Sequence, residues 1–228
     1  LLGARAAAGF FLPGQYCPSR ARFLPYPSGE PEVWRHLRLM EFLGVPLQGD
    51  ALEFPLHPED HAALAALPEA GSLEAGTYAC VHPGAHTRTR RWPAEQFARV
   101  ADRLAARGLR VVLTGTQREA KVAQAVRQAM QADALDLTGR TSLGALAALL
   151  RSARLLICND TGISHLAAAL RVPSVVVFTG SDVVRWAPLD RQLHRAVGRP
   201  VPLTRRQRQA ARDAAPADLP TPHEVLAH

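Results

Sequence analysis

Residues 154–173 read RLLICNDTGISHLAAALRVP and carry more information about the architecture than any other part of the chain. The apolar run 155–158 has the length of a buried strand. Asn159 to Gly162 follow it with turn and helix-capping residues, and a helical pattern then continues to Pro173. A second apolar run, 174–178, comes next. This order predicts a strand, a tight turn, a helix and a second strand, and ligands of open α/β sheets bind where such strands end.

The turn itself has the features of an anion site. Asp160 or Thr161 can cap the first helical turn, and the free N–H groups of residues 161–163, with the helix dipole, favour a negative charge. Gly162 removes a side chain where a ligand must approach closely. His165 lies one turn after Thr161, on the same side of the helix. The alternative interpretation is an ordinary capped helix with a solvated His165.

Short apolar runs and helical patterns alternate from residue 77 onward. The pattern predicts strands at 77–82, 110–114, 134–137, 155–158 and 175–178. It predicts helices at 93–107, 118–131 and 142–151, with a fourth after residue 162. Five strands joined by four helices are typical of an α/β fold with one parallel, doubly wound sheet. We expect this domain to span 76–198.

The two ends of the chain have different patterns. Residues 1–75 hold a proline-rich stretch, a helical pattern at 32–43 and further helical residues after Pro58, without a comparable set of strands. They predict an incomplete, mainly helical segment, the end of another α/β domain plus a linker. Residues 199–228 are rich in Arg, Ala and Pro, which favours a loosely ordered tail with a short closing helix near 222–228.

Composition narrows the function classes. The net charge of +7 comes almost wholly from arginine, since Lys121 is the only lysine, and it favours anionic partners. A nucleic-acid binder, resting on this charge and on Arg205, Arg206 and Arg208, lacks interleaved aromatic residues and a known motif. No apolar run approaches the roughly 18 residues of a membrane span. Three cysteines without metal or redox spacing indicate a reducing cytoplasm.

A second polar loop follows the first strand of the regular half and reads HPGAHTRTRRWP, residues 82–93. Gly84 lets the backbone approach a ligand, and three crowded arginines are most easily accommodated by a polyanion. The alternative is a solvated basic loop. Because this loop and the Asp160 loop both follow sheet strands, we expect them to converge on one diphosphate site.

A third loop, TGTQRE at 114–119, follows the second strand. Glu119 is placed to accept hydrogen bonds from ribose hydroxyls, although an acid favoured by the helix dipole is an equal alternative. The chain lacks G-x-G-x-x-G, the P-loop pattern and an Asp-x-Asp pair, so neither a dinucleotide oxidoreductase, a P-loop NTPase nor a metal-bridged diphosphate is favoured.

Two segments, HPGAHTRTRRWPAEQFARVADRLAARGLRVVLTGTQRE and ICNDTGISHLAAALRVPSVVVFTGSDVVRWAPL, together resemble the family 9 glycosyltransferases. The best-known members of that family are ADP-heptose:lipopolysaccharide heptosyltransferases. The likeness runs from residue 77 to 189, and weaker similarity reaches back through 25–45. It implies a GT-B architecture of two Rossmann-like domains, the C-terminal one holding the nucleotide-sugar donor, and an inverting, metal-independent transfer.

The resemblance also assigns residues. Asp160, Thr161, Gly162 and His165 match the segment around the donor's diphosphate and sugar, and Glu119 matches the ribose-binding acid. His86 and Arg90 stand where the family has a hydroxyl residue and a lysine on the phosphates. With Gly84, these complete the expected donor site. Trp186 matches a signature with a structural role.

One departure concerns catalysis, because the family's catalytic base, an aspartate near the start of the first domain, has no counterpart in these residues. The resemblance implies transfer of a heptose from ADP-heptose to a lipopolysaccharide core or another glycan, with no cofactor and no nucleic acid. It also implies a cytoplasmic site of action with peripheral contact at the inner membrane. The alternative is a catalytically incomplete fragment that binds a nucleotide sugar.

Overall fold

The computed structural model describes residues 4–198 and 219–227, which form two compact units. One unit holds residues 4–51 with Val184–Trp186, and the other holds the rest of the described chain. The boundary lies before α2 (Pro58–Ala65) and not at the expected residue 75, because α2 packs against α5 (Leu143–Arg151) of the larger unit. The roles expected for the two parts stay predictions.

The larger unit contains one six-stranded parallel sheet, which confirms the predicted fold class. Its strand order is β5 (Ala134–Asp136), β4 (Arg110–Leu113), β3 (Tyr78–His82), β6 (Leu155–Asn159), β7 (Ser174–Phe178) and β8 (His194–Gly198). The chain runs outward from β3 to β5 and then returns to place β6 beside β3. Ligand crevices of open α/β sheets form at such a reversal. The loops after β3 and β6 therefore leave neighbouring strands at one edge.

Strand β8 is the one sheet member that the sequence does not predict. Its residues, HRAVG, lie at the edge of the sheet, and only two of the five are buried. An edge strand covered on one side lacks the continuous apolar run that marks β3, β6 and β7. The pattern of hydrophobicity was therefore too weak to reveal it.

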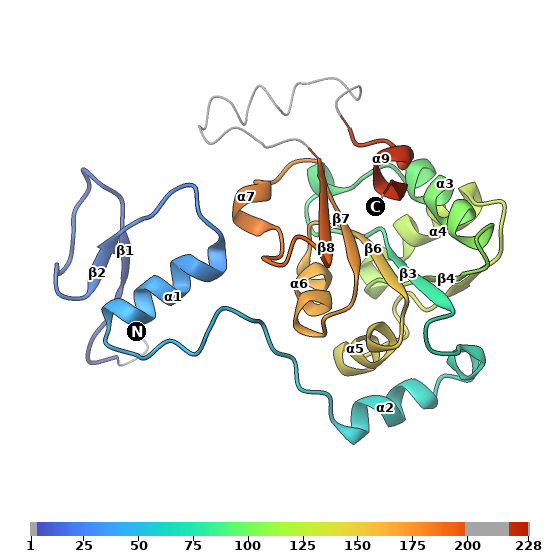
Figure 1. The fold of residues 1–228 in the computed structure, drawn as a ribbon, viewed down its shortest axis with the longest axis horizontal. Coiled ribbons are helices and arrows are strands. Elements are labelled where there is room, and N and C mark those ends of the chain that lie inside the picture. Colours follow the sequence, from blue (N-terminus) through green and yellow to red (C-terminus); the bar gives the residue numbers. More distant parts are fainter. Residues whose placement is uncertain (1–3, 199–218, 228) are drawn as a thin grey trace. The chain divides into compact units, whose positions relative to one another are not determined.

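Helices cover both faces of the sheet (Figure 1). On one face α3 (Ala94–Ala105) packs against α4 (Ala120–Ala129) and α9 (Pro222–Leu226). On the other, α5 contacts α6 (Gly162–Ala169). The expected helix at 118–131 is split, because a short 3₁₀ turn, η3 (Gln117–Glu119), precedes α4.

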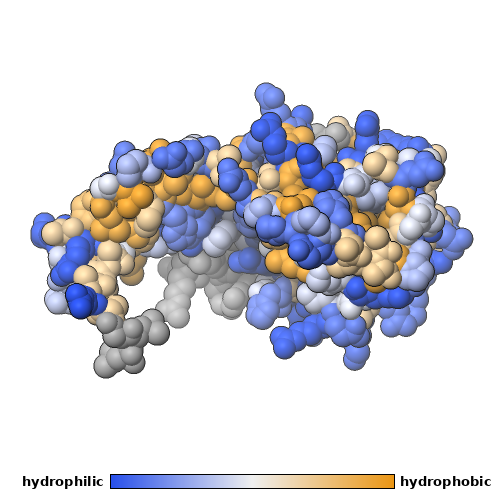
Figure 2. Space-filling view, turned by 90° about the horizontal axis from the view of Figure 1, so that it is seen from below, coloured by the Kyte–Doolittle hydropathy of each residue, from blue (hydrophilic) through white to orange (hydrophobic). Residues whose placement is uncertain are grey.

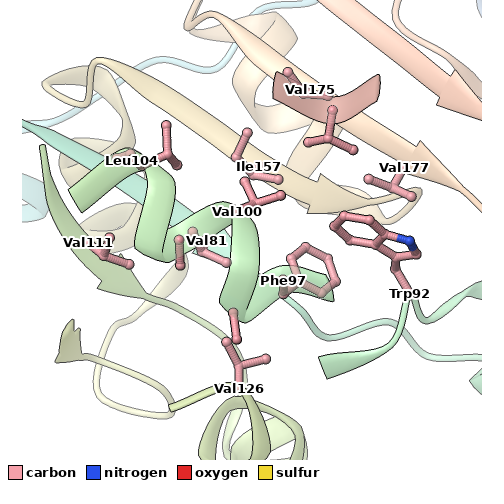
Figure 3. Packing of buried hydrophobic residues seen from close by; sticks show 14 of the residues in the cluster. Val81, Trp92, Phe97, Val100, Leu104, Val111, Val126, Ile157, Val175 and Val177 are labelled. Atoms are coloured by element: carbon pink, nitrogen blue, oxygen red, sulfur yellow. The ribbon is translucent and has the colours of Figure 1, made fainter. Parts of the chain in front are cut away.

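The core beneath α3 joins the sheet to both neighbouring helices. Phe97, Val100 and Leu104 of α3 pack on valines of the central strands, and Val126 adds the contact from α4 (Figure 3). Trp92, which precedes α3, is 1% exposed and meets Phe97 edge to face with the ring centroids 5.0 Å apart. These side chains form one buried apolar cluster between α3, α4 and the sheet.

The end of the chain is more ordered than expected where the structure describes it. The indole N–H of Trp92 donates to the carbonyl oxygen of Pro220, and Val225 of α9 is buried in the core. This corrects the expectation of a loosely ordered tail for residues 219–227 and confirms the closing helix. Residues 199–218, including Arg205–Arg208, lie outside the described part.

The smaller unit is not wholly helical. Two three-residue strands, β1 (Gly9–Phe11) and β2 (Phe23–Pro25), pair in parallel before α1 (Glu32–Phe42). These strands could not be predicted from the proline-rich sequence, because neither is long enough to show an alternating pattern. Arg35 of α1 is buried with its guanidinium 4.3 Å above the ring of Tyr26. Within the same unit Arg185 pairs with Glu32, and Trp186 lies under the Arg185 guanidinium.

Apolar side chains gather on the surface of this smaller unit, as the orange band at the left of Figure 2 shows. Nine of its described large hydrophobic residues are exposed: Leu12, Tyr16, Trp34, Met40, Phe42, Leu43, Val45, Leu47 and Val184. A contiguous apolar surface is typical of an interaction site.

The three cysteines are free thiols, and Cys80 and Cys158 are buried in β3 and β6. Burial raises the pKa of both thiols, so they behave as small apolar side chains. Every helix formed by the described residues is too short or too polar to cross a bilayer.

Acid is expected to destabilise the protein through its buried histidines. Burial is the main cause that lowers the pKa of His82, His165 and His194 below the ordinary 6.5, against the opposing effect of a nearby carboxylate. The unfolded chain therefore binds more protons, so the free energy of unfolding falls as the pH drops through 6.5. Urea unfolding at pH 7.5 and pH 5 measures this fall.

His194 provides a specific check, because its Nδ1 lies 2.8 Å from the Ser174 hydroxyl in a buried pair. His194→Asn keeps a polar partner for Ser174 but removes the titrating ring, so we expect a smaller loss of stability at pH 5. The exposed His61, changed to Asn in the same way, should leave the pH dependence of the parent unchanged. An undiminished fall in the His194→Asn variant would contradict this assignment.

Candidate functional site

A pocket of about 540 Å³ lies at the carboxyl ends of β3, β4 and β6, within the larger unit. The loops after these strands form its polar side, and the first turns of α5 and α6 form its apolar side. Its lining residues are His82, Ala85, His86, Arg91, Thr116, Arg118, Glu119, Leu143, Leu146, Thr161, Gly162, Ile163 and Leu166.

Asn159, the last residue of β6, ties the two principal loops together. Its side-chain Nδ2 donates to the carbonyl oxygens of Pro83 and Gly84 at 2.8 and 3.3 Å. Its Oδ1 accepts from the backbone N–H of Trp92 at 2.9 Å, so both ends of the arginine-rich loop are held. The amide is fully buried. The expectation that the two loops converge on one crevice is confirmed.

A charged contact adds to this junction. The Nη1 atom of Arg90 lies 3.4 Å from Oδ2 of Asp160, which is buried and has no hydrogen-bond partner among the described residues. Oδ2 of Asp160 can therefore still accept a hydrogen bond from a further donor. The two residues thus lie side by side next to the pocket and do not themselves line it.

The start of α6 presents unused backbone donors. Thr161 occupies the N-cap position, but neither its side chain nor that of Asp160 caps the helix, so the expected side-chain cap is absent. Among the described residues, no acceptor meets the N–H groups of Thr161, Gly162 and Ile163. Because a helix N-terminus carries a partial positive charge, these groups form a place for an anion.

Glu119 occupies the position opposite the start of α6. Its Oε2 accepts from the N–H and the hydroxyl of Thr116 at 2.8 and 2.9 Å, and His82 Nε2 lies 3.7 Å away. A Cβ atom on Gly84 would collide with the carboxyl end of Glu119, so a side chain there would require Glu119 to move. The space beside Gly84, which was expected to admit a ligand, is therefore occupied by the side chain of Glu119. Glu119 caps η3 and also lines the pocket, and its expected role toward a ribose stays a prediction.

The predicted site residues lie in one region of the structure, but they differ in how exposed they are to the pocket. His86, Glu119, Thr161 and Gly162 line the pocket, while Gly84, Arg90 and Asp160 adjoin it through the contacts above. His165 is half-buried in the first turns of α6. Burial lowers the pKa of its imidazole, and Asp160 opposes that shift. Whether these residues bind a donor stays a prediction.

Several pocket residues were missed by the sequence reasoning. Arg91 lines the pocket, and its Nε is fixed by the carbonyl oxygen of Ala85 at 2.8 Å. Leu143 and Leu146 form an apolar wall from α5, where Leu143 is 63% exposed. The exposure of Leu143 is a property of the fold, so the sequence alone carried no signal for this apolar wall.

The arrangement suits a ligand with three chemical parts. Guanidinium groups and free N–H groups can bind an anion, and Glu119 can accept hydrogen bonds from hydroxyls. The leucine wall can cover a planar apolar ring. Within residues 4–198 and 219–227, no three His, Cys, Asp or Glu side chains gather as they would around a metal ion.

The sequence profile "Glycosyltransferase family 9 (heptosyltransferase)" matches residues 15–213, most of the chain. The chain belongs to glycosyltransferase family 9. Its match covers the whole sheet up to β8 and both principal loops of the pocket.

Curated relatives in family 9 are similar over part of their length. Lipooligosaccharide heptosyltransferase 2 of Haemophilus influenzae is 30% identical over 105 residues, which are 44% of this chain and 30% of that protein. Lipopolysaccharide heptosyltransferase 3 of Escherichia coli K12 is 33% identical over 114 residues, 49% of this chain and 33% of that protein. The matched region thus spans about a third of these relatives.

Solved structures share the fold. A family 9 glycosyl transferase from Veillonella parvula superposes with a TM-score of 0.76 at 21% identity, over 90% of this chain and 60% of that one. ADP-heptose lipopolysaccharide heptosyltransferase II of Escherichia coli gives a TM-score of 0.61 at 24% identity, over 82% and 54%. The fold expected from the family resemblance is therefore confirmed.

Proposed function

We propose that the pocket binds the nucleotide diphosphate part of a nucleotide-sugar donor, and that the chain is the donor-binding part of a heptosyltransferase-type glycosyltransferase. The expected donor is ADP-heptose, and the expected acceptor is a lipopolysaccharide core or a similar glycan. Family membership and the names of the curated relatives support this choice.

The observation that carries the proposal is the juxtaposition across the pocket. Three free backbone N–H groups start α6, Arg90 and Arg91 come from the loop after β3, and Glu119 follows β4. One pocket thus offers donors for an anion and an acceptor for hydroxyl groups, which are the groups that the diphosphate and the ribose of a nucleoside diphosphate require. In the proposed reaction the acceptor hydroxyl attacks the anomeric carbon, and the bond to the diphosphate breaks with inversion. The free N–H groups and the guanidinium would stabilise the departing charge without a metal.

No described residue is assigned as the base that removes the acceptor's proton, so the proposal assigns donor binding, and not the proton transfer, to these residues. The alternative is a fragment that binds a nucleotide sugar without transferring it. Action in the cytoplasm and peripheral contact with the inner membrane also stay predictions.

Two measurements test the proposal in sequence. Calorimetric titration with ADP should give saturable binding at one site, and absence of binding to the folded protein would overturn the proposal. Transfer of radiolabelled heptose to a lipopolysaccharide-type acceptor then separates the candidates. Turnover by the 228-residue chain would exclude the binding-only fragment, while binding without turnover would support it.

Gly162 offers a variant that separates binding from folding. A Cβ atom at this exposed position meets nothing within 4 Å, so Gly162→Ala and Gly162→Leu should melt at or slightly above the temperature of the parent. Each added carbon, however, enters space beside the free N–H groups of α6. We expect ADP binding to fall about tenfold for alanine and further for leucine, since about 1.4 kcal/mol is a tenfold change.

The control is Gly71, whose Cβ would also meet nothing within 4 Å and which lies in η1 (Pro68–Ser72), outside the pocket lining. Gly71→Leu should leave ADP affinity unchanged. If both leucine variants bind ADP like the parent, the start of α6 is not the phosphate site.

A further inference from the structure

One carboxylate oxygen of Glu119 accepts hydrogen bonds, and the other has no donor among the described residues. Oε2 accepts two hydrogen bonds from Thr116, one from its N–H and one from its hydroxyl. Among the described residues, no donor reaches Oε1. A carboxylate with one oxygen anchored presents the second in a defined direction.

The surroundings of the carboxyl group limit its other positions. The missing side chain of Gly84 leaves the space that Oε1 and Cδ of Glu119 occupy, with a would-be Cβ at 2.2 Å from both. On another side His82 is buried, and its Nδ1 lies 3.1 Å from the Thr114 hydroxyl. Burial lowers the pKa of His82 against the opposing effect of Glu119, which favours the neutral imidazole beside Oε2.

We infer that Thr116 is a positioning residue: its hydroxyl fixes the carboxylate of Glu119, which the family resemblance already assigns to the ribose, and so strengthens the preference of the pocket for nucleotides that carry ribose hydroxyls. This inference rests on the proposed function. The inference is carried by one observation: Oε2 of the Glu119 carboxylate is hydrogen-bonded, whereas Oε1 has no donor among the described residues. Thr116 lines the pocket and is exposed, so its hydroxyl contributes to the orientation of Glu119 and little to the core.

The test compares ADP with 2′,3′-dideoxy-ADP, which lacks both ribose hydroxyls. The parent should bind ADP about tenfold or more tightly than the dideoxy analogue, because a hydrogen bond to a charged group is stronger than one between neutral groups. Thr116→Val removes the hydroxyl and keeps the shape. It should weaken ADP binding several-fold, leave dideoxy-ADP binding unchanged, and so reduce the preference.

Two further variants make the result specific. Thr116→Ser restores the hydroxyl and should restore the preference for ADP. Thr77→Val is the matched control, since Thr77 is exposed, its hydroxyl donates to the carbonyl oxygen of Glu74 ahead of β3, and it lies outside the pocket lining. It should change neither affinity. Thermal melting of each variant checks that the fold is intact.

The outcomes separate this inference from the function on which it rests. If the parent binds neither nucleotide, the proposed function is wrong. If it binds both equally, or if Thr116→Val weakens both by the same factor, the nucleotide site stands and the role of Thr116 is overturned. Loss of preference in Thr116→Val with recovery in Thr116→Ser supports the inference.

Discussion

Trp92→Ala should lower the free energy of unfolding by about 3–5 kcal/mol, the usual cost of removing a buried aromatic side chain. The Trp92 indole is 1% exposed and packs edge to face on Phe97. Its removal leaves a cavity beneath α3 and takes away the indole donor to the Pro220 carbonyl oxygen. The contact that joins α9 to the rest of the core is weakened at the same time.

Urea unfolding of Trp92→Ala measures this loss, and Trp34→Ala is its control. Trp34 is 44% exposed, and its indole N–H donates to Asp50 near the surface of the smaller unit. We expect a change of about 1 kcal/mol or less there, as for most surface substitutions. Similar losses for the two tryptophans would contradict the central position of Trp92. Trp92→Phe should recover part of the stability by filling most of the cavity.

Asn159→Ala is expected to act on both the fold and the pocket. It leaves the N–H of Trp92 and the carbonyl oxygens of Pro83 and Gly84 without their buried partner. Since one unsatisfied buried group costs about 1–3 kcal/mol, we expect a total of about 3 kcal/mol. The arginine-rich loop also loses its attachment to β6, so ADP affinity should fall more than tenfold at a temperature where the variant is folded.

Asn159→Asp distinguishes the two ends of the amide. An aspartate still accepts from the N–H of Trp92, but it places an oxygen against the carbonyl oxygens of Pro83 and Gly84. Repulsion and the burial of a charge should make this variant at least as unstable as Asn159→Ala. Urea unfolding and ADP titration measure both effects. A stable aspartate variant with normal ADP binding would contradict the role of Asn159 as a donor between the loops.

Much of the larger unit could be predicted from local pattern. The buried strands β3, β6 and β7 have continuous apolar runs, and α3 buries the face that its spacing indicated. Edge strand β8 and the short strands β1 and β2 could not be predicted in this way. Their residues are only partly buried or too few to form a period, so composition does not distinguish them from loops.

The residue types of the site could be predicted from the sequence, but their arrangement in space could not. Asp160, Thr161 and Gly162 were found because turn residues follow a buried strand, and Arg90 because charges crowd one loop. The contact between Arg90 and Asp160, and the part played by Asn159, depend on β6 lying beside β3. Those strands are separated by more than 70 residues of sequence, a distance that local pattern does not bridge.

The amino-acid order alone determined the alternation of strands and helices, the parallel sheet and the chemical character of the loops, because these follow from hydrophobic period and side-chain type over a few neighbouring residues. Only the tertiary structure decided that Gly84 makes room for Glu119, that Thr116 anchors one carboxylate oxygen, and that α9 packs against α3. Each of these depends on where distant strand ends meet in space, and close packing, not local propensity, determines that.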